Sequence, residues 1–160
     1  MEIPNEFDGM PDFEKFFRYR DLEDEAGEEW KNVPKRIAAK DLYEQAWKVF
    51  NYSRLFCESL KGEFAEMNSS LILQNATILC PKIVGAEGGD NYIIRMENAS
   101  IIRTNAIELR TQVKACAIFD EASEDLAEVI VDEIELFKEK FKIWISYFEK
   151  DDSEDDWGLY

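Results

Sequence analysis

Five basic residues in the second half of the chain could together bind an anionic partner. Arg103, Arg110 and Lys114 fall within about 40° of one another at ~100° per residue, so they share one side of a helix. If this helix and the next one are antiparallel, Lys138 lies level with Arg103, and Lys142 extends the set. A stripe of cations of this kind is typical of proteins that contact a nucleic-acid backbone.

Acidic residues offer a second interpretation of the same stripe. Glu128, Glu135 and Glu139 are equally well placed to pair with the two arginines. The cations would then form ion pairs between helices or between subunits, and no nucleic acid would be needed to explain them. The residues alone leave both interpretations open.

Few residues in this sequence could take part in catalysis. The chain contains no histidine, which removes catalytic triads, histidine-activated cysteines and most zinc sites. Its three cysteines, Cys57, Cys80 and Cys116, show no CxxC spacing and indicate reduced thiols. They lie in or near apolar rows, so we expect burial to raise their pKa values. We predict no catalytic residue and no cofactor.

Carboxylates alone could still hold a metal ion. Glu97, Glu108 and Glu133 are the candidates. They stand off the apolar rows described below, where glutamates usually face solvent. We therefore predict no metal site.

The glycines between residues 85 and 89 raise the question of a phosphate-binding loop. Gly85, Gly88 and Gly89 match neither GxGxxG nor GxxxxGK[ST], and no strand is expected before them. We interpret them instead as positive-φ positions at which the chain reverses between two helices.

The net charge of −16 is concentrated at the two ends of the chain. Residues 1–33 hold 11 acids against 4 bases, and residues 151–160 hold 5 acids and no base. The region between them is nearly balanced. An acidic surface repels nucleic acid in general, although a local basic patch can persist on the central region.

Apolar residues recur at steps of three and four in four segments, which is the pattern of amphipathic helices. Four such helices with short connections predict an all-α, antiparallel up-down-up-down four-helix bundle over residues 34–150. Residues 1–33 form an acidic extension with a possible short helix in residues 12–25, and residues 151–160 form an acidic tail. The rows are Leu42, Ala46, Val49, Ser53, Phe56 and Leu60 in residues 34–61; Ala65, Ile72, Ala76, Leu79 and Ile83 in residues 63–84; Ala99, Ile102, Ala106, Leu109, Val113 and Cys116 in residues 91–118; and Ile130, Ile134, Phe137, Phe141, Trp144 and Phe148 in residues 123–150.

Individual residues predict where these helices begin and end. Asn32 is a plausible cap for the first helix, and Gly62 should stop it. Pro81 should kink the second helix or end it. Asp90 or Asn91 can cap the third.

Two stretches resemble a known family. SSLILQNATILCPKIVGAEG and ENASIIRTNAIELRTQVKAC are similar to the four-helix-bundle proteins encoded in 23S rRNA intervening sequences, and to the related accessory variability determinant of diversity-generating retroelements. Pro81 with Ala86, Glu87 and Gly88 matches the motif at the end of the family's second helix, and Glu108-Leu109 with Gln112 matches its third. The resemblance covers about residues 38–148. It implies the bundle fold and a ring-like homo-oligomer, often a pentamer; the retroelement proteins bind RNA and a reverse transcriptase.

These observations predict a cytoplasmic bacterial bundle protein that is not an enzyme, self-associates and serves as an interaction module. The alternative is a nucleic-acid-binding adaptor that uses the basic stripe. No membrane partner is expected, since no apolar run reaches ~18 residues. Apolar residues beside the rows predict a subunit interface, and these are Tyr43, Trp47, Ile93, Ile101 and Ile107.

Overall fold

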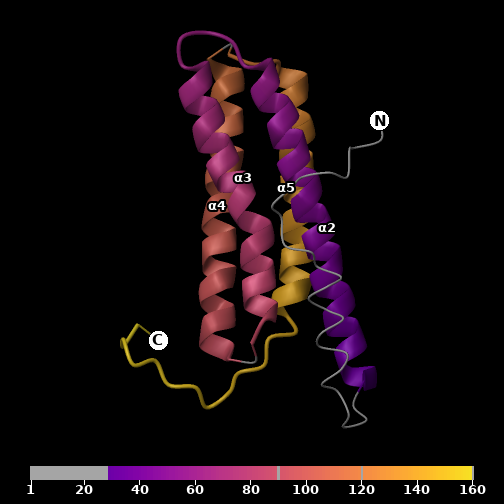
Figure 1. Cartoon of the computed structure of the whole chain (residues 1–160). Coiled ribbons are helices and arrows are strands. Elements are labelled where there is room, and N and C mark those ends of the chain that lie inside the picture. The colour runs from indigo at the N-terminus through magenta and orange to yellow at the C-terminus, as the bar shows by residue number, and fades with distance from the viewer. Residues whose placement is uncertain (1–28, 90, 120, 160) are drawn as a thin grey trace.

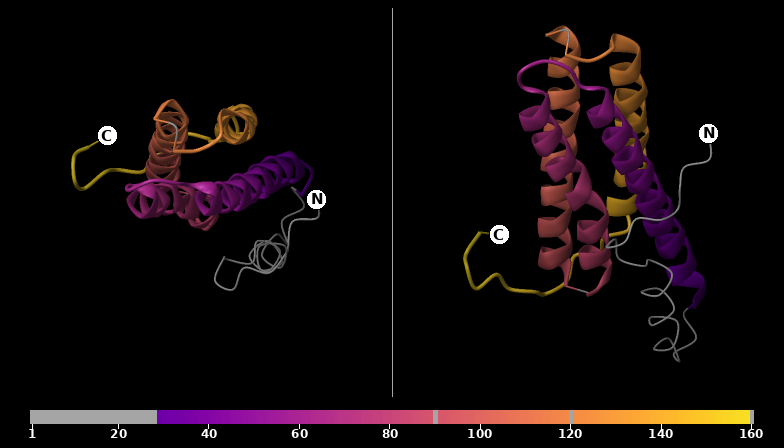
Figure 2. Two further views of the ribbon diagram at one scale, coloured as in Figure 1. Left: turned by 90° about the horizontal axis from the view of Figure 1, so that it is seen from above. Right: turned by 45° about the horizontal axis from the view of Figure 1, so that its top comes forward.

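The computed structural model describes residues 29–89, 91–119 and 121–159, with the backbone alone for residues 29–32. These residues form four helices and no strand: α2 (Glu29–Ser59), α3 (Ala65–Glu87), α4 (Tyr92–Ile118) and α5 (Glu124–Ile145). Successive helices run in opposite directions (Figure 1), and seen from above they form a four-sided bundle (Figure 2). The predicted all-α four-helix fold is confirmed. The predicted short helix in residues 12–25 lies outside the described residues.

Local hydrogen bonds account for the beginnings of α4 and α5. The side chain of Asn91 accepts from the Ile94 N–H at 3.0 Å, and Ser123 Oγ accepts from the Leu126 N–H at 3.4 Å. Asn91 is thus a cap, as predicted, whereas the other candidate, residue 90, is not described. At the end of α2, Gly62 has a φ of +93° in the link that follows Ser59, which fits its predicted role as a helix stop.

Other predictions of helix boundaries are wrong. α2 begins at Glu29, so Asn32 lies inside the helix and does not cap it. The φ of proline, about −65°, is itself helical, so Pro34 fits inside α2 at the loss of one backbone hydrogen bond. At its other end, α5 stops at Ile145 and not at the predicted residue 150. The chain tightens there, because Phe148 N–H donates to the carbonyl of Ile145, only three residues back.

Of the two effects predicted for Pro81, the end of the helix is wrong, since α3 continues to Glu87. Ile83, Ala86 and Glu87 are buried beyond the proline, so tertiary packing outweighs the missing hydrogen bond. Gly88, at the end of α3, has a φ of −69°. Only Gly62 and Gly158 have positive φ among the described glycines, so the positive-φ interpretation of residues 85–89 is wrong where the chain is described.

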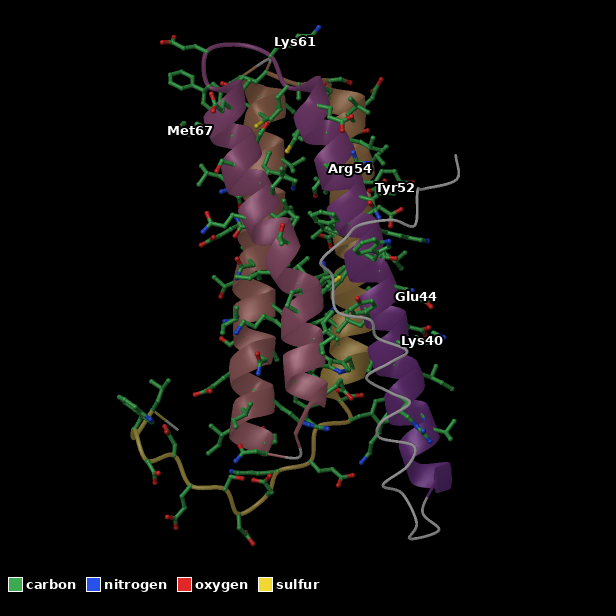
Figure 3. All side chains as sticks on the ribbon, in the orientation of Figure 1. Lys40, Glu44, Tyr52, Arg54, Lys61 and Met67 are labelled. Carbon is green, nitrogen blue, oxygen red and sulfur yellow. The ribbon has the colours of Figure 1, made fainter. Side chains whose placement is uncertain are left out.

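The predicted apolar rows form the core, except for Ala65 at the start of α3, which is only partly buried. α2 and α4 contribute small buried residues such as Ala46, Ser53 and Ala99, which allow helices to approach closely. α5 contributes the large aromatic residues Phe137 and Trp144, which are 2% and 1% exposed. On the outward side of α2, Lys40 and Glu44 point away from the bundle (Figure 3).

Hydrogen bonds from side chains on one helix to groups on another set how the helices align. Asn75 on α3 donates to Gln112 on α4 at 3.0 Å. Gln45 on α2 donates to the carboxylate and to the backbone carbonyl of Glu133 on α5. Trp144 on α5 donates to Glu87 on α3, as described below.

Within the described part of the chain, no helix has both the length and the apolar character needed to cross a bilayer.

Candidate interaction groove

A groove of about 310 Å³ lies between α4 and α5, and four of the five predicted stripe residues line it. Arg103 and Arg110 come from α4, and Lys138 and Lys142 come from α5. The antiparallel direction of the two helices brings these pairs to the same level, as the sequence predicted. Lys114 is exposed on α4 and does not line the groove.

The floor of the groove is apolar. α4 and α5 are the least closely packed of the four neighbouring helix pairs, and the groove opens between them. Ile107 keeps 47% of its surface exposed there. A ligand that fills this groove would need both an apolar group and a negative charge. The floor residues are Ala106, Ile107, Ile134, Phe137 and Phe141.

Ion pairs neutralise part of the rim. Arg110 Nη1 lies 2.6 Å from Glu135 Oε1, and Lys138 binds the other oxygen of the same carboxylate. Lys142 pairs with Glu139 at 2.8 Å. Hydrogen bonds from Lys138 and from Arg110 lower the pKa of Glu135 below its usual value, so this carboxylate stays ionised at neutral pH.

The rim nevertheless keeps an excess of positive charge. Its four cations face two carboxylates, and Arg103 has no ion-pair partner among the residues that the structure describes. The ion-pair interpretation is therefore confirmed for Arg110, which pairs across the two helices. It does not account for Arg103, which remains available to a ligand.

The three thiols are placed for packing and not for reaction. Burial raises the pKa of Cys80 to about 12 and that of Cys116 to about 11, and it also raises the pKa of Cys57. All three are free cysteines. The expectation of raised thiol pKa values is confirmed, and thiolates are scarce at neutral pH.

The structure does not bring the three candidate metal ligands together. Glu97 and Glu108 belong to α4, whereas Glu133 on α5 accepts its hydrogen bond from Gln45 of α2. In the described ranges no group of three or more carboxylates or thiolates is placed to hold a metal ion.

Two of the residues that carry the family resemblance, Glu87 and Gln112, join helices through hydrogen bonds. Glu87 is 5% exposed and accepts a hydrogen bond of 2.9 Å from the indole N–H of Trp144. Ala86 is buried, Pro81 and Gly88 are exposed, and Gln112 accepts from Asn75. Gly85, beside the motif, lies against α4, where an added Cβ would stand 3.3 Å from Asn98 Oδ1. These positions indicate a structural role for the motif.

The predicted interface residues divide into two groups. Tyr43 and Trp47 are partly buried and pack on the protein's own core. Ile93 and Ile101 are also partly buried, and Ile107 lies in the groove.

A second apolar row on α5, which was not predicted from the sequence, faces outward, and we call it the outward stripe. It consists of Leu126, Val129, Leu136 and Ile143, which are 44%, 43%, 45% and 55% exposed.

Compared with known proteins, the chain matches no family model, no curated protein and no solved structure. The groove and the surface of α5 are therefore the features from which we infer its function.

Proposed function

We propose that this protein is a non-enzymatic interaction protein that associates with further copies of itself, and the observation that carries the proposal is the outward stripe of α5. Its positions follow steps of three, seven and seven, with Glu133 and Lys140 at the intervening heptad places. This is the spacing of the row that α5 already buries. The inner row of α5 packs against α2 and α4. A second row with the same spacing is suited to pack against a further helix.

The charges along α5 favour a second copy of the same helix as the missing neighbour. Residues 124–135 carry six acids and no base, whereas residues 136–145 carry three lysines and one glutamate. Two copies of α5 packed antiparallel would place the acidic half of each against the basic half of the other. A parallel arrangement would oppose like charges. The expected contact is therefore self-complementary and twofold.

Changing the stripe tests the proposal. We expect the full chain to scatter light with a mass above 18.7 kDa at physiological salt, and the double variant Leu136→Gln/Ile143→Gln to have a lower mass than the unchanged chain. Both residues are about half exposed, so the fold should tolerate the change. The matched control is Leu71→Gln/Ile94→Gln, which alters residues of 40% and 49% exposure on α3 and α4 and should leave the mass unchanged.

The measured mass also decides between arrangements. A mass of two chains is the outcome that a twofold α5 contact predicts, and a monomer at every concentration would overturn the proposal. The resemblance to the intervening-sequence proteins favours a mass of about five chains, which needs a contact between two different surfaces. We place this assembly in the cytoplasm, where the three thiols stay reduced.

A second candidate function is nucleic-acid binding at the groove, and the excess of cations on its rim favours it. Binding to phosphates should then weaken steeply as salt rises and disappear in Arg103→Glu/Arg110→Glu. Lys114→Glu, outside the groove, is the control for placing a negative charge on α4. Absence of RNA or DNA binding at ~50 mM salt would dismiss this candidate.

A further inference from the structure

The segment that follows α5 carries an exposed apolar group with acidic residues around it. Trp157 and Leu159 are 96% and 74% exposed. Asp152, Glu154 and Asp156 precede them and are exposed as well. A tryptophan this exposed is unusual for a folded chain, and tryptophan is among the residues most enriched at the centres of protein interfaces.

Hydrogen bonds order the tip of this tail. The side chain of Asp155 accepts from the backbone N–H groups of Trp157 and Leu159, and its carbonyl accepts from Gly158 at 3.0 Å. Gly158 has a φ of +69°, which its lack of a Cβ makes favourable. The turn presents Trp157 in a defined position, so binding through it loses less conformational entropy than binding through a flexible tail.

The groove between α4 and α5 has the complementary chemistry. Its volume of about 310 Å³ is at the low end for ligand sites, so it suits one or two large side chains and not a whole helix. Its floor offers Ile107 and Phe141 to an indole ring, and its rim offers Arg103 and the exposed Lys142, whose pair with Glu139 is open to solvent, to carboxylates. We propose that the groove of one chain binds the C-terminal tail of a second copy, with Trp157 on the floor and the tail carboxylates on the rim.

The path of the tail favours a second copy over the chain's own groove. Asp151 Oδ2 accepts from the Tyr92 N–H at 2.9 Å, which ties the tail to the start of α4. Beyond this point the tail passes α4 and leaves on the side away from α5 (Figure 1, Figure 2). The groove between α4 and α5 is therefore not on the side to which the chain's own tail points.

This inference rests on the proposed self-association and adds a contact of a different kind. Tail and groove are different surfaces, so the contact is heterologous and leads to rings or open chains of molecules. The groove and the outward stripe occupy different sides of α5, so both contacts can form at once. A twofold α5 contact alone would stop at two chains.

Mixing two variants tests the contact directly. The Trp157→Ala chain keeps its groove but loses its anchor, and the Arg103→Glu/Lys142→Glu chain keeps its tail but loses its rim. We expect the fluorescence anisotropy of N-terminally labelled Trp157→Ala chain to rise when the rim variant is added. The control partner is the rim variant that also carries Trp157→Ala. We expect it to bind the labelled chain with about thirtyfold lower affinity than the rim variant does.

Exchanging the charges of the tail and the rim tests whether the rim variant loses binding only because it folds poorly. Asp152→Lys/Glu154→Lys/Asp156→Lys leaves Asp151 and the Asp155 turn intact, and its tail should bind the rim variant but not the unchanged groove. If wild-type chains associate but the anisotropy does not rise, or rises equally with the control partner, the tail contact is wrong and the proposed self-association stands. If wild-type chains stay monomeric at all concentrations, both proposals are wrong.

Discussion

The two flanks of α4 are packed in different ways. Toward α3, with which its packing is closest, Gly85 of α3 lies against Asn98, and Asn75 donates to Gln112. Toward α5, the long side chains of Arg103 and Arg110 leave a groove. Small residues let two backbones approach and build the fold, whereas long cationic residues leave a hollow that another molecule can fill. The difference separates the flank that supports the bundle from the flank that is available for binding.

The largest expected effect comes from truncating a side chain on the core side of α4. Leu109 is fully buried, and Leu109→Ala should lower the free energy of unfolding by about 2–5 kcal/mol, because the cavity it leaves cannot collapse. Ile107→Ala, two residues away in the groove, is the matched control and should cost less than about 1 kcal/mol. Chemical denaturation measures both. Equal losses would mean that the groove is as well packed as the core.

Substitution of Glu87 is expected to have the second-largest effect on stability. Glu87→Ala removes the acceptor for the buried indole N–H of Trp144 and should destabilise the protein by about 1–3 kcal/mol. Glu87→Gln keeps an oxygen at the same place and should cost less. Thermal unfolding compares the two variants. If both are equally destabilised, the negative charge of Glu87 and not its hydrogen bond is what the fold requires.

Alkaline pH should weaken the closely packed part of the bundle. Burial raises the pKa of Cys80 from its ordinary value of 9.0 to about 12. The unfolded chain therefore loses this proton first as pH rises, so the contribution to stability is complete below pH 9 and declines between pH 9 and 12. The decline is at most about 1.4 kcal/mol per pH unit.

Comparison with Cys80→Ala isolates this effect from the titration of lysines and tyrosines. The variant starts less stable because of its cavity, but its free energy of unfolding should decrease less steeply above pH 9. Denaturant unfolding at several pH values gives both slopes. Parallel slopes would show that the Cys80 thiol is not protected from ionisation.

The sequence predicted the fold because burial alone imposes the spacing of the apolar rows. It also predicted the rim, since one helical face and one antiparallel pair suffice to bring Arg103 and Lys138 together. The bond from Trp144 to Glu87 joins residues 57 positions apart and depends on packing that no local pattern encodes. The outward stripe could in principle have been predicted from the sequence, but it has the same heptad spacing as the inner row of the same helix. Local rules also predict that a helix ends at Pro81. In the structure, buried residues beyond Pro81 keep the chain helical.

The smallest effect on stability, and the sharpest test of the groove, is expected from Glu135→Gln. This carboxylate binds both Arg110 and Lys138 at the rim, and its side chain is 39% exposed. Its removal should leave the unfolding transition almost unchanged, because exposed ion pairs contribute little. It should nevertheless strengthen binding of the acidic tail in the anisotropy assay, since two more cations become free to pair with it. Glu128→Gln makes the same change of charge outside the groove and should not strengthen binding. Equal behaviour of the two variants would mean that Arg110 and Lys138 serve the bundle alone, and that Arg103 and Lys142 are the cations that select the partner.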